Sequence, residues 1–199
     1  MKNLKFPLYL IIIIPLIIFG CFSQSPSNVK NDNDQKAAKI IAVMAVDNKT
    51  TDSKASVLLR NKIINELYLK GYTKVSPEII DKKLEPLYSK AGKGSYGIVA
   101  PQVVKELVGA DGVMYCALIE SSRSVGWFYA PVNIAVRCEL RSAQTGEVIW
   151  SADYKSNRRN FDITGNRLEI KSRAAFEEVM DEVVTKVMET LPDGPKLQG

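Results

Sequence analysis

Histidine is absent from the 199 residues of this sequence. Its absence excludes Ser-His-Asp and Cys-His nucleophile chemistry, and it removes the side chain that most often binds metal ions in proteins. The acidic residues do not replace it. Asp47, Asp52 and Asp81 are not spaced as an acid–base pair, and no group of Cys, Asp and Glu has the spacing of metal ligands. We therefore expect a protein that is not an enzyme and that uses no metal or cofactor.

The chain also lacks a large excess of charge of one sign. It contains 27 Lys and Arg against 22 Asp and Glu, a net charge of +5 at pH 7. Two of the lysines lie in residues 1–20, so the rest of the chain has 25 basic and 22 acidic residues and a net charge of +3. A balance this mild does not favour nucleic-acid binding, and we expect no nucleic-acid partner.

The apolar run near the start of the chain is short for a transmembrane helix. Phe6–Gly20 has 15 residues. As a helix at ~1.5 Å per residue it would span about 22 Å, against a hydrocarbon core of about 30 Å. Pro7 and Pro15 disfavour a long helix further. An uncleaved membrane anchor is therefore the weaker interpretation of this segment, and an export signal is the stronger one.

The start of the sequence has the three-part form of an export signal. Lys2 and Lys5 precede the apolar run, and Cys21 follows it. This arrangement resembles a bacterial lipoprotein signal, in which the thiol of Cys21 receives a diacylglycerol and residues 1–20 are removed. The resemblance implies acyl chains such as palmitate at Cys21, which would hold the protein in a bilayer at ~0.8 kcal/mol per buried methylene. Phe22 replaces the Asp that resembles an inner-membrane retention signal. We therefore expect the periplasmic face of the outer membrane rather than the inner membrane.

Composition divides the rest of the chain into three parts. Residues 21–38 comprise the lipidated cysteine and a polar stretch, which predicts a flexible tether. Its 17 residues after Cys21 would reach about 20–25 Å as a random coil. Residues 39–191 are numerous enough for a single domain with its own core, and residues 192–199 are predicted to be a disordered tail.

The hydrophobic pattern of 39–191 predicts an α+β domain. The expected elements are a strand at 39–46, a helix from Asp52 or Ser53 to 70, a short strand at 72–75, a helix from 77 to 87, a helix at 101–108, strands at 112–122, 132–141 and 148–154, and a helix at 168–191. The order is β-α-β-α-α-β-β-β-α. Two N-terminal strands and a three-stranded antiparallel meander are expected to form one mixed sheet with helices packed on it.

Three cysteines are present, of which Cys116 and Cys138 are not used by the signal. If the first two meander strands turn symmetrically about Trp127, these two cysteines face each other, and Met114 faces Leu140 on the same apolar side. Cysteines opposite each other at a non-hydrogen-bonded site lie near disulfide range, and the periplasm permits the bond. Two buried free thiols are the alternative, and the pattern leaves both open.

Three consecutive aromatic residues, Trp127, Phe128 and Tyr129, occupy the tip of this hairpin. Exposed aromatic side chains anchor interfaces, so the tip predicts contact with a partner or a membrane. The alternative is that the loop folds back and the rings cover the edge of the sheet. Arg158 and Arg159 could contact lipid phosphate or an acidic partner, but a solvated loop is the expectation for residues 156–166.

Two stretches resemble one family of small bacterial lipoproteins of unknown function, which includes a meningococcal vaccine-candidate antigen. Gly109–Tyr115 resembles a GADAVLY-type start of a strand, and Thr145–Trp150 resembles a TGELLW-type hairpin. The order of elements also resembles the periplasmic domains of curli-export lipoproteins, of penicillin-binding-protein activator lipoproteins, and of the TolB amino-terminal domain. The sequence departs from the family at Ser124–Tyr129, where the connection is longer and more aromatic.

These resemblances imply a function through analogy of fold. We expect a non-enzymatic lipoprotein whose domain docks onto or assembles a cell-envelope complex, in a secretion or surface-assembly system. Its partners would be the bilayer, through Cys21, and an envelope protein, with an oligomer of the chain as a further arrangement. Activation of a peptidoglycan synthase is the alternative function, although a longer tether would suit it better.

Overall fold

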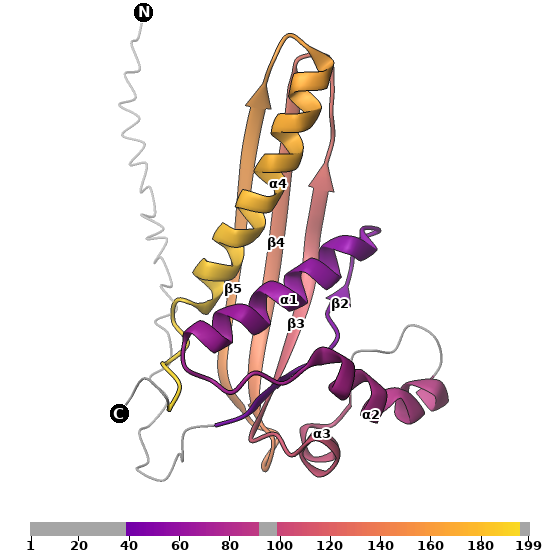
Figure 1. Cartoon of the computed structure of the whole chain (residues 1–199), viewed down its shortest axis with the longest axis vertical. Coiled ribbons are helices and arrows are strands. Elements are labelled where there is room, and N and C mark those ends of the chain that lie inside the picture. Colours follow the sequence, from indigo (N-terminus) through magenta and orange to yellow (C-terminus); the bar gives the residue numbers. More distant parts are fainter. Residues whose placement is uncertain (1–38, 92–98, 196–199) are drawn as a thin grey trace, which may run out of the picture. The chain divides into compact units, whose positions relative to one another are not determined.

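The structure is a computed structural model that describes residues 39–91 and 99–195. Its elements, in chain order, are β1 (Ile41–Val43), β2 (Asp47–Asn48), α1 (Ser53–Leu69), α2 (Pro77–Ala91), α3 (Pro101–Val108), β3 (Gly112–Arg123), β4 (Tyr129–Ser142), β5 (Val148–Phe161) and α4 (Gly165–Met188). They form one five-stranded sheet in the order β1-β3-β4-β5, with β2 also beside β3 (Figure 1). β1 and β2 run parallel to β3, and the other pairs are antiparallel. The predicted α+β class and single mixed sheet are confirmed.

Helices cover both faces of the sheet, and each face has its own core. The larger core lies between the sheet and helices α1 and α4, with fully buried residues such as Leu59, Leu118 and Met180. A smaller core lies behind the start of β3, where α2 and α3 pack on Met44 and Val113. Figure 1 shows α4 lying along β4 and β5. On the other face, α2 and α3 pack only near the start of β3. Most of that face of the meander is therefore open to solvent, as expected for a sheet with one wet face.

The helix boundaries follow signals in the sequence. The carboxylate of Asp52 accepts hydrogen bonds from the N–H groups of Lys54 and Ala55 (3.1 and 3.0 Å), which makes it the N-cap of α1. Gly71 follows α1 with a φ of 86°, a conformation that glycine adopts without strain. Pro77 opens α2 as predicted, because a proline at the first helical position lacks only an N–H that would be unpaired there.

The predicted strand at 72–75 is reduced to a single parallel bridge between Thr73 and Ile40. Gly71 follows α1 and Pro77 begins α2, and five residues lie between these two positions. The apolar run at 39–46 also leaves the sheet after β1, and the chain returns to β3 at Asp47–Asn48.

Strands β3 and β4 pair in the predicted register up to Leu118. Met114 lies opposite Leu140, Cys116 opposite Cys138, and Leu118 opposite Val136. Beyond Leu118 a β-bulge shifts the register by one residue, so that Glu120 lies opposite Ala135. Ile119 is the extra residue, and it is 45% exposed. A bulge inserted in this way bends the strand and increases its twist.

Strand β5 extends to Phe161, so the prediction of a polar loop from residue 156 was wrong. Even-numbered residues of β5 face the buried side chains of β4, and this alternation continues through Ser156 and Arg158. These two side chains are polar because they meet acids of α4. Ser156 Oγ donates to Glu182 (3.1 Å), and Arg158 pairs with Glu178. Side chains of β5 therefore continue to alternate between the two faces of the sheet after residue 155, although those on the inner face are no longer apolar. Among the described residues, β4 is the only strand beside β5.

The end of the described chain packs on the domain instead of leaving it at Leu191. The Tyr72 hydroxyl donates to the Pro192 carbonyl (2.8 Å), and the Gly194 N–H donates to the Lys70 carbonyl (2.6 Å). Burial, and then the negative charge of Asp193, raise the pKa of Tyr72. A side chain at position 194 would collide with the Gly71 backbone at 2.7 Å, so glycine is required. Residues 192–195 of the expected tail thus lie beside the end of α1, and 196–199 lie outside the described residues.

Candidate functional site

Two connections meet at one end of the sheet, where the β3–β4 hairpin turns and where β5 passes into α4 (Figure 1). The register brings them together, because Tyr129 lies opposite Phe161. We call this region, residues 121–132 and 158–173, the hairpin end. Its exposed apolar side chains are Val125, Trp127, Phe128, Phe161, Ile163 and Ile170. Among the described residues, no aromatic side chain outside the hairpin end is as exposed as Trp127 or Phe128.

Trp127 is 93% exposed and Phe128 is 62% exposed. The backbone holds them there, because the Gly126 N–H donates to the Tyr129 carbonyl (2.8 Å) and the Asp162 N–H donates to the Phe128 carbonyl (3.2 Å). Tyr129 differs, since its ring packs on Phe161 with centroids 5.2 Å apart. The alternative in which the rings fold back onto the sheet therefore describes Tyr129, and the other two rings face solvent.

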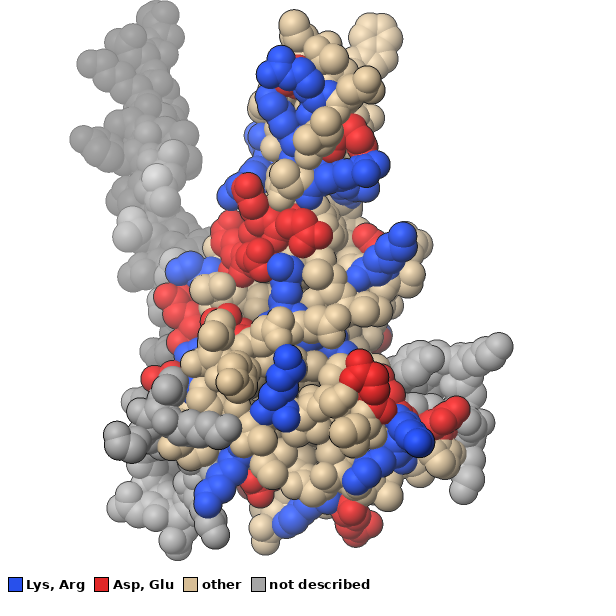
Figure 2. Space-filling view, in the orientation of Figure 1, with Lys and Arg blue, Asp and Glu red and all other residues tan. Residues whose placement is uncertain are grey.

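The hairpin end has more basic than acidic residues. Its two ranges contain six basic residues and two acidic residues, a local net charge of +4. The basic residues are Arg123, Arg158, Arg159, Arg167, Lys171 and Arg173, and the acidic ones are Asp162 and Glu169. Figure 2 shows Lys and Arg side chains at this end and a group of Asp and Glu further along α4. The hairpin end therefore combines apolar side chains with a positive field.

Asp162 fixes the turn from β5 into α4. Its side chain is 7% exposed, lies 2.7 Å from the ammonium group of Lys171, and accepts a hydrogen bond from the Thr164 N–H (3.0 Å). The hydrogen bond from Lys171, and then that from Thr164, lower the pKa of Asp162. Lys171 also donates to the Phe161 carbonyl (3.2 Å), so the end of β5 is tied to the first turns of α4. The contacts of Asp162 and Lys171 therefore support the turn that carries these apolar side chains.

Cys116 and Cys138 lie opposite each other near the middle of β3 and β4. A disulfide joins them in the structure, with Cα atoms 4.1 Å apart, and both residues are buried against the larger core. Such a bond fixes the register of the hairpin three residues before Ile119, the extra residue of the bulge.

We predict that this disulfide is present in protein isolated from the oxidising cell envelope. Alkylation of the unfolded, unreduced chain followed by mass spectrometry should modify neither Cys116 nor Cys138, and reduction should make both reactive. The Cys116→Ser variant is the control, because it must leave one reactive thiol at Cys138. Two alkylated thiols before reduction would contradict the prediction.

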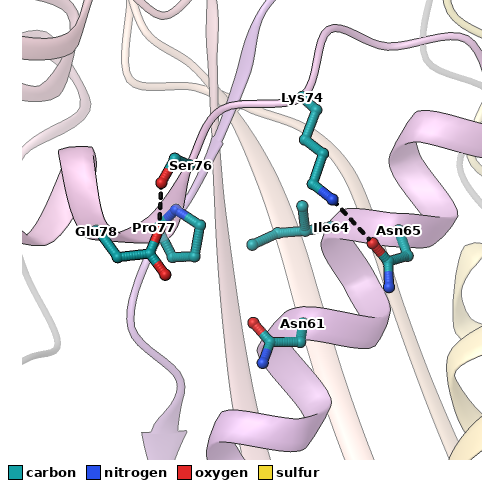
Figure 3. Close-up of a pocket in the computed structure, with 7 residues that line it drawn as sticks. All are labelled: Asn61, Ile64, Asn65, Lys74, Ser76, Pro77 and Glu78. Atoms are coloured by element: carbon teal, nitrogen blue, oxygen red, sulfur yellow. Dashed lines mark hydrogen bonds between the residues drawn. The ribbon is translucent and has the colours of Figure 1, made fainter.

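A groove of about 400 Å³ lies between α1 and residues 74–78 (Figure 3). Its polar side chains are engaged with one another. Lys74 donates to the Asn65 side chain (3.3 Å), and the Ser76 hydroxyl donates to the Glu78 carboxylate, which lowers the pKa of Glu78. Figure 3 shows both contacts, with Asn61 on the facing turn of α1. The groove contains no pair of groups arranged for acid–base or nucleophilic chemistry.

The three aspartates considered in the sequence have structural partners. Asp47 pairs with Lys49 (2.7 Å), Asp52 caps α1, and Asp81 pairs with Arg60 (2.6 Å). No cluster of Cys, Asp and Glu within 39–91 and 99–195 could hold a metal ion. No helix in these ranges is long and apolar enough to cross a membrane. Cys21, the predicted lipid-attachment residue, lies outside the described residues.

Three exposed apolar residues of the hairpin end, Phe161, Ile163 and Ile170, were not predicted from the sequence. Phe161 and Ile163 belong to the stretch at 156–166 that was assigned to a polar loop. A signal did exist, because the pairing of Leu140 with Trp150, extended without a shift, places Phe161 opposite Tyr129. Extending the register of the second hairpin, rather than following its hydrophobicity, would have found the contact.

Comparisons with known proteins agree on family and fold. The model of one family, described as "Putative lipoprotein GNA1162-like", matches residues 31–194. The crystal structure of lipoprotein GNA1162 from Neisseria meningitidis is 15% identical, over 70% of this chain and 96% of that chain, with a TM-score of 0.53. The PelC dodecamer from Paraburkholderia phytofirmans is 19% identical, over 78% of this chain and 88% of that chain, with a TM-score of 0.50.

A third solved structure, the C-terminal domain of LpoB from Escherichia coli, is 23% identical over 62% of this chain and 86% of that chain. Its TM-score is 0.43. No curated protein sequence matches the chain. At identities this low, the likeness to GNA1162 and PelC shows a shared fold and nothing about activity.

Proposed function

The chain belongs to the GNA1162-like lipoprotein family, and from this premise we propose that it is a lipid-anchored, non-enzymatic docking or assembly component of a cell-envelope complex. Acylation of Cys21 would attach it to the bilayer. The absence of Asp after Cys21 favours the periplasmic face of the outer membrane. The engaged aspartates and the lack of histidine support a role without catalysis.

The observation that carries the docking role is the exposure of the hairpin end. Side chains such as Trp127 and Ile163, which are 93% and 96% exposed, gain nothing for folding. A contiguous exposed apolar patch with charged neighbours is typical of an interaction surface. The disulfide, the Asp162 turn and the packing of α4 would support this surface, and a preorganised surface has a lower entropy cost of binding. A chain without catalytic groups can act through such a surface.

The partner at the hairpin end is an envelope component. A second copy of the chain is one candidate, since the structure of PelC, which shares the fold, is that of a dodecamer. Activation of a peptidoglycan synthase stays a prediction, with no observation among the described residues in its favour.

Photo-crosslinking in intact cells tests the proposal. A diazirine amino acid replaces either Phe128 at the hairpin end or Arg137, an exposed residue of β4 on the open face of the sheet. We expect adducts with a protein or a lipid at position 128 and several-fold fewer at position 137, because apolar surface is buried where contact is made. The abundance and thermal stability of both variants should match the parent chain. Equal adduct yields at the two positions would refute the proposed docking surface.

A further inference from the structure

We propose that the hairpin end is a second membrane-contact site, at which exposed apolar side chains enter the headgroup region of a bilayer rich in anionic lipid. The inference rests on the proposed function, because a lipid anchor at Cys21 is what keeps this end close to a bilayer. It identifies the envelope component contacted by the hairpin end as anionic lipid, and it gives the domain a defined orientation relative to the bilayer.

The size and shape of the apolar group suit a bilayer better than a folded protein. Stable protein interfaces bury about 800 Å² on each partner, usually around a pocket that receives an anchor residue. The hairpin end instead presents a few side chains on two adjoining turns, led by Trp127, Phe128 and Ile163. Tryptophan is enriched at membrane–water interfaces because its ring is apolar while its N–H remains hydrated. A protruding group of this kind needs no complementary pocket.

The charges lie behind the apolar side chains, in the order a bilayer requires. Phe161 ends β5, and Arg159 lies two residues before it, about 7 Å further from the turn at ~3.4 Å per residue. Arg123 occupies the end of β3, before the loop that carries Trp127. Arg159 has no ion pair with another described residue, and Arg123 lies near enough to Glu169 for its charge to help lower the pKa of that carboxyl. Interfacial segments bury apolar groups about 5–10 Å into the boundary of the headgroups, which leaves these guanidinium groups at the level of lipid phosphate.

An acidic protein is the competing occupant, and the arrangement favours it less. Charged residues are depleted from the centre of protein interfaces and aromatic residues are enriched there, so the aromatics would lie in the middle of a wider flat patch. Here the aromatic residues lie at the extreme end of the sheet, with solvent on several sides of Trp127. A membrane surface is the broad partner that can receive such an end.

The position of the N-terminal connection is compatible with contact to the same bilayer. The Lys39 N–H donates to Asp111 (3.0 Å) beside the start of β3, at the opposite end of the meander from the hairpin end. The 14 residues of β4 separate the two ends by about 45 Å. The 18 peptide steps from Cys21 to Lys39 can span about 60 Å when extended. The anchor therefore permits the domain to lie along the bilayer, and the hairpin end selects that orientation.

The anchor also relaxes the affinity that the contact needs. Linking two binding events converts the second into an intramolecular one, with an effective concentration in the millimolar range for a short flexible linker. A few interfacial side chains and basic residues then suffice to keep the hairpin end on the bilayer. A tether alone would leave the domain free to rotate, so this contact decides which face of the sheet is presented to a partner.

The chain supplies its own reporter, because it contains two tryptophans, Trp127 and Trp150. The Trp150→Phe variant of the lipidated full chain leaves only Trp127. The Trp127→Phe variant is the matched control and leaves Trp150, whose indole N–H donates to Thr190 (3.1 Å) near the opposite end of β5. Both are reconstituted in vesicles of phosphatidylcholine, with or without phosphatidylglycerol. In anionic vesicles, emission from Trp127 should shift to shorter wavelength and be quenched by lipids brominated near the headgroup, while emission from Trp150 stays unchanged.

A charge-reversal pair tests the basic residues. Each Lys or Arg near an anionic surface contributes about fivefold to the binding constant, so Arg159→Glu should lower the equilibrium constant for the contact, derived from the Trp127 response, at least fivefold. Arg137→Glu, the same change on the open face of β4, should leave the response intact. The proposal is overturned if Trp127 responds to neither vesicle, if it responds equally to both, or if the two reversals weaken the response equally.

The outcomes also separate this inference from the function on which it rests. Mass spectrometry of the Cys21 peptide from the same preparation reports the anchor. Acyl mass on Cys21 and protein adducts at position 128 in cells, without a vesicle response, would overturn the lipid contact and leave the docking role standing. Absence of acyl mass on Cys21 would instead remove the premise of a lipid-anchored protein.

Discussion

Replacement of Cys21 by serine is expected to abolish attachment of fatty acid to the protein, and with it the permanent lipid anchor. The serine hydroxyl cannot form the thioether that carries the diacylglycerol, so no acyl chain is attached. Lipoproteins of this kind typically carry three acyl chains, each stabilised by ~0.8 kcal/mol per buried methylene, whereas a folded domain without them has only weak surface contacts. Labelling with a palmitate analogue, followed by detergent phase partition, measures the effect.

Two comparisons make this experiment decisive. The Cys138→Ser variant keeps Cys21 and should retain both the label and membrane partition, which separates the role of position 21 from a general effect of cysteine loss. Mass spectrometry of the parent protein should show a modified Cys21 at the new N-terminus. A labelled Cys21→Ser protein, or a parent protein that retains residues 1–20, would show that anchoring works in another way.

Replacement of Arg60 by methionine should destabilise the domain by about 2–4 kcal/mol, the second large effect. Arg60 is 8% exposed, and two of its nitrogens donate to the Val43 carbonyl (3.1 and 2.9 Å). The guanidinium also binds both carboxylate oxygens of Asp81 (2.6 and 2.8 Å). It thereby joins α1, α2 and the end of β1. Methionine fills much of the space but leaves a buried carbonyl without its donor.

Urea unfolding of Arg60→Met and Arg158→Met compares a buried pair with an exposed one. The Arg158 side chain is 42% exposed and its partner Glu178 is 60% exposed, so solvent screens their attraction. Losing that pair should cost less than about 1 kcal/mol. The midpoint should therefore fall much further for Arg60→Met, at an unchanged dependence on urea. Equal losses in the two variants would mean that burial of Arg60 contributes nothing.

Sequence reasoning succeeded where a period was carried by apolar residues. The alternation in β3 and β4 predicted the pairing of Met114 with Leu140 and of Cys116 with Cys138. A register shifted by one residue would have placed the apolar side chains of one strand on the solvent face of the sheet. The same reasoning could not detect the bulge after Leu118. Ile119 reads as one more apolar residue, and only the partner strand reveals that it has no counterpart.

The end of β5 escaped prediction for a different reason. Its side chains that face the core side near the hairpin end are Ser156 and Arg158. They contact Glu182 and Glu178 of α4, which follows later in the sequence. The local hydrophobic pattern cannot predict a contact with residues so distant in the sequence. Arg60 was missed in the same way, because one arginine in an amphipathic helix reads as a solvated side chain until its acceptors are known.

The candidate site was found in part for related reasons. Trp127 and Phe128 stand out in any reading of the chain, because three aromatic residues follow one another in a turn. Their neighbours Phe161 and Ile163 become part of the same surface only through the pairing of β4 with β5. Backbone hydrogen bonds decide which ring is exposed to solvent and which packs on the sheet. These hydrogen bonds cannot be predicted from the amino-acid composition.

The outer edge of β5, with which no described strand pairs, limits how copies of this protein can recognise one another. Edge strands can template the addition of a further strand, and charged side chains oppose that addition. If two copies joined antiparallel with Asn157 at the centre, Lys155 of each would lie against Arg159 of the other, and like charges at opposed positions repel. Homotypic strand addition in this register is thereby discouraged, whereas a segment rich in Asp and Glu could be accommodated. A ring or filament built from the chain would then have to use another register of this edge or another face.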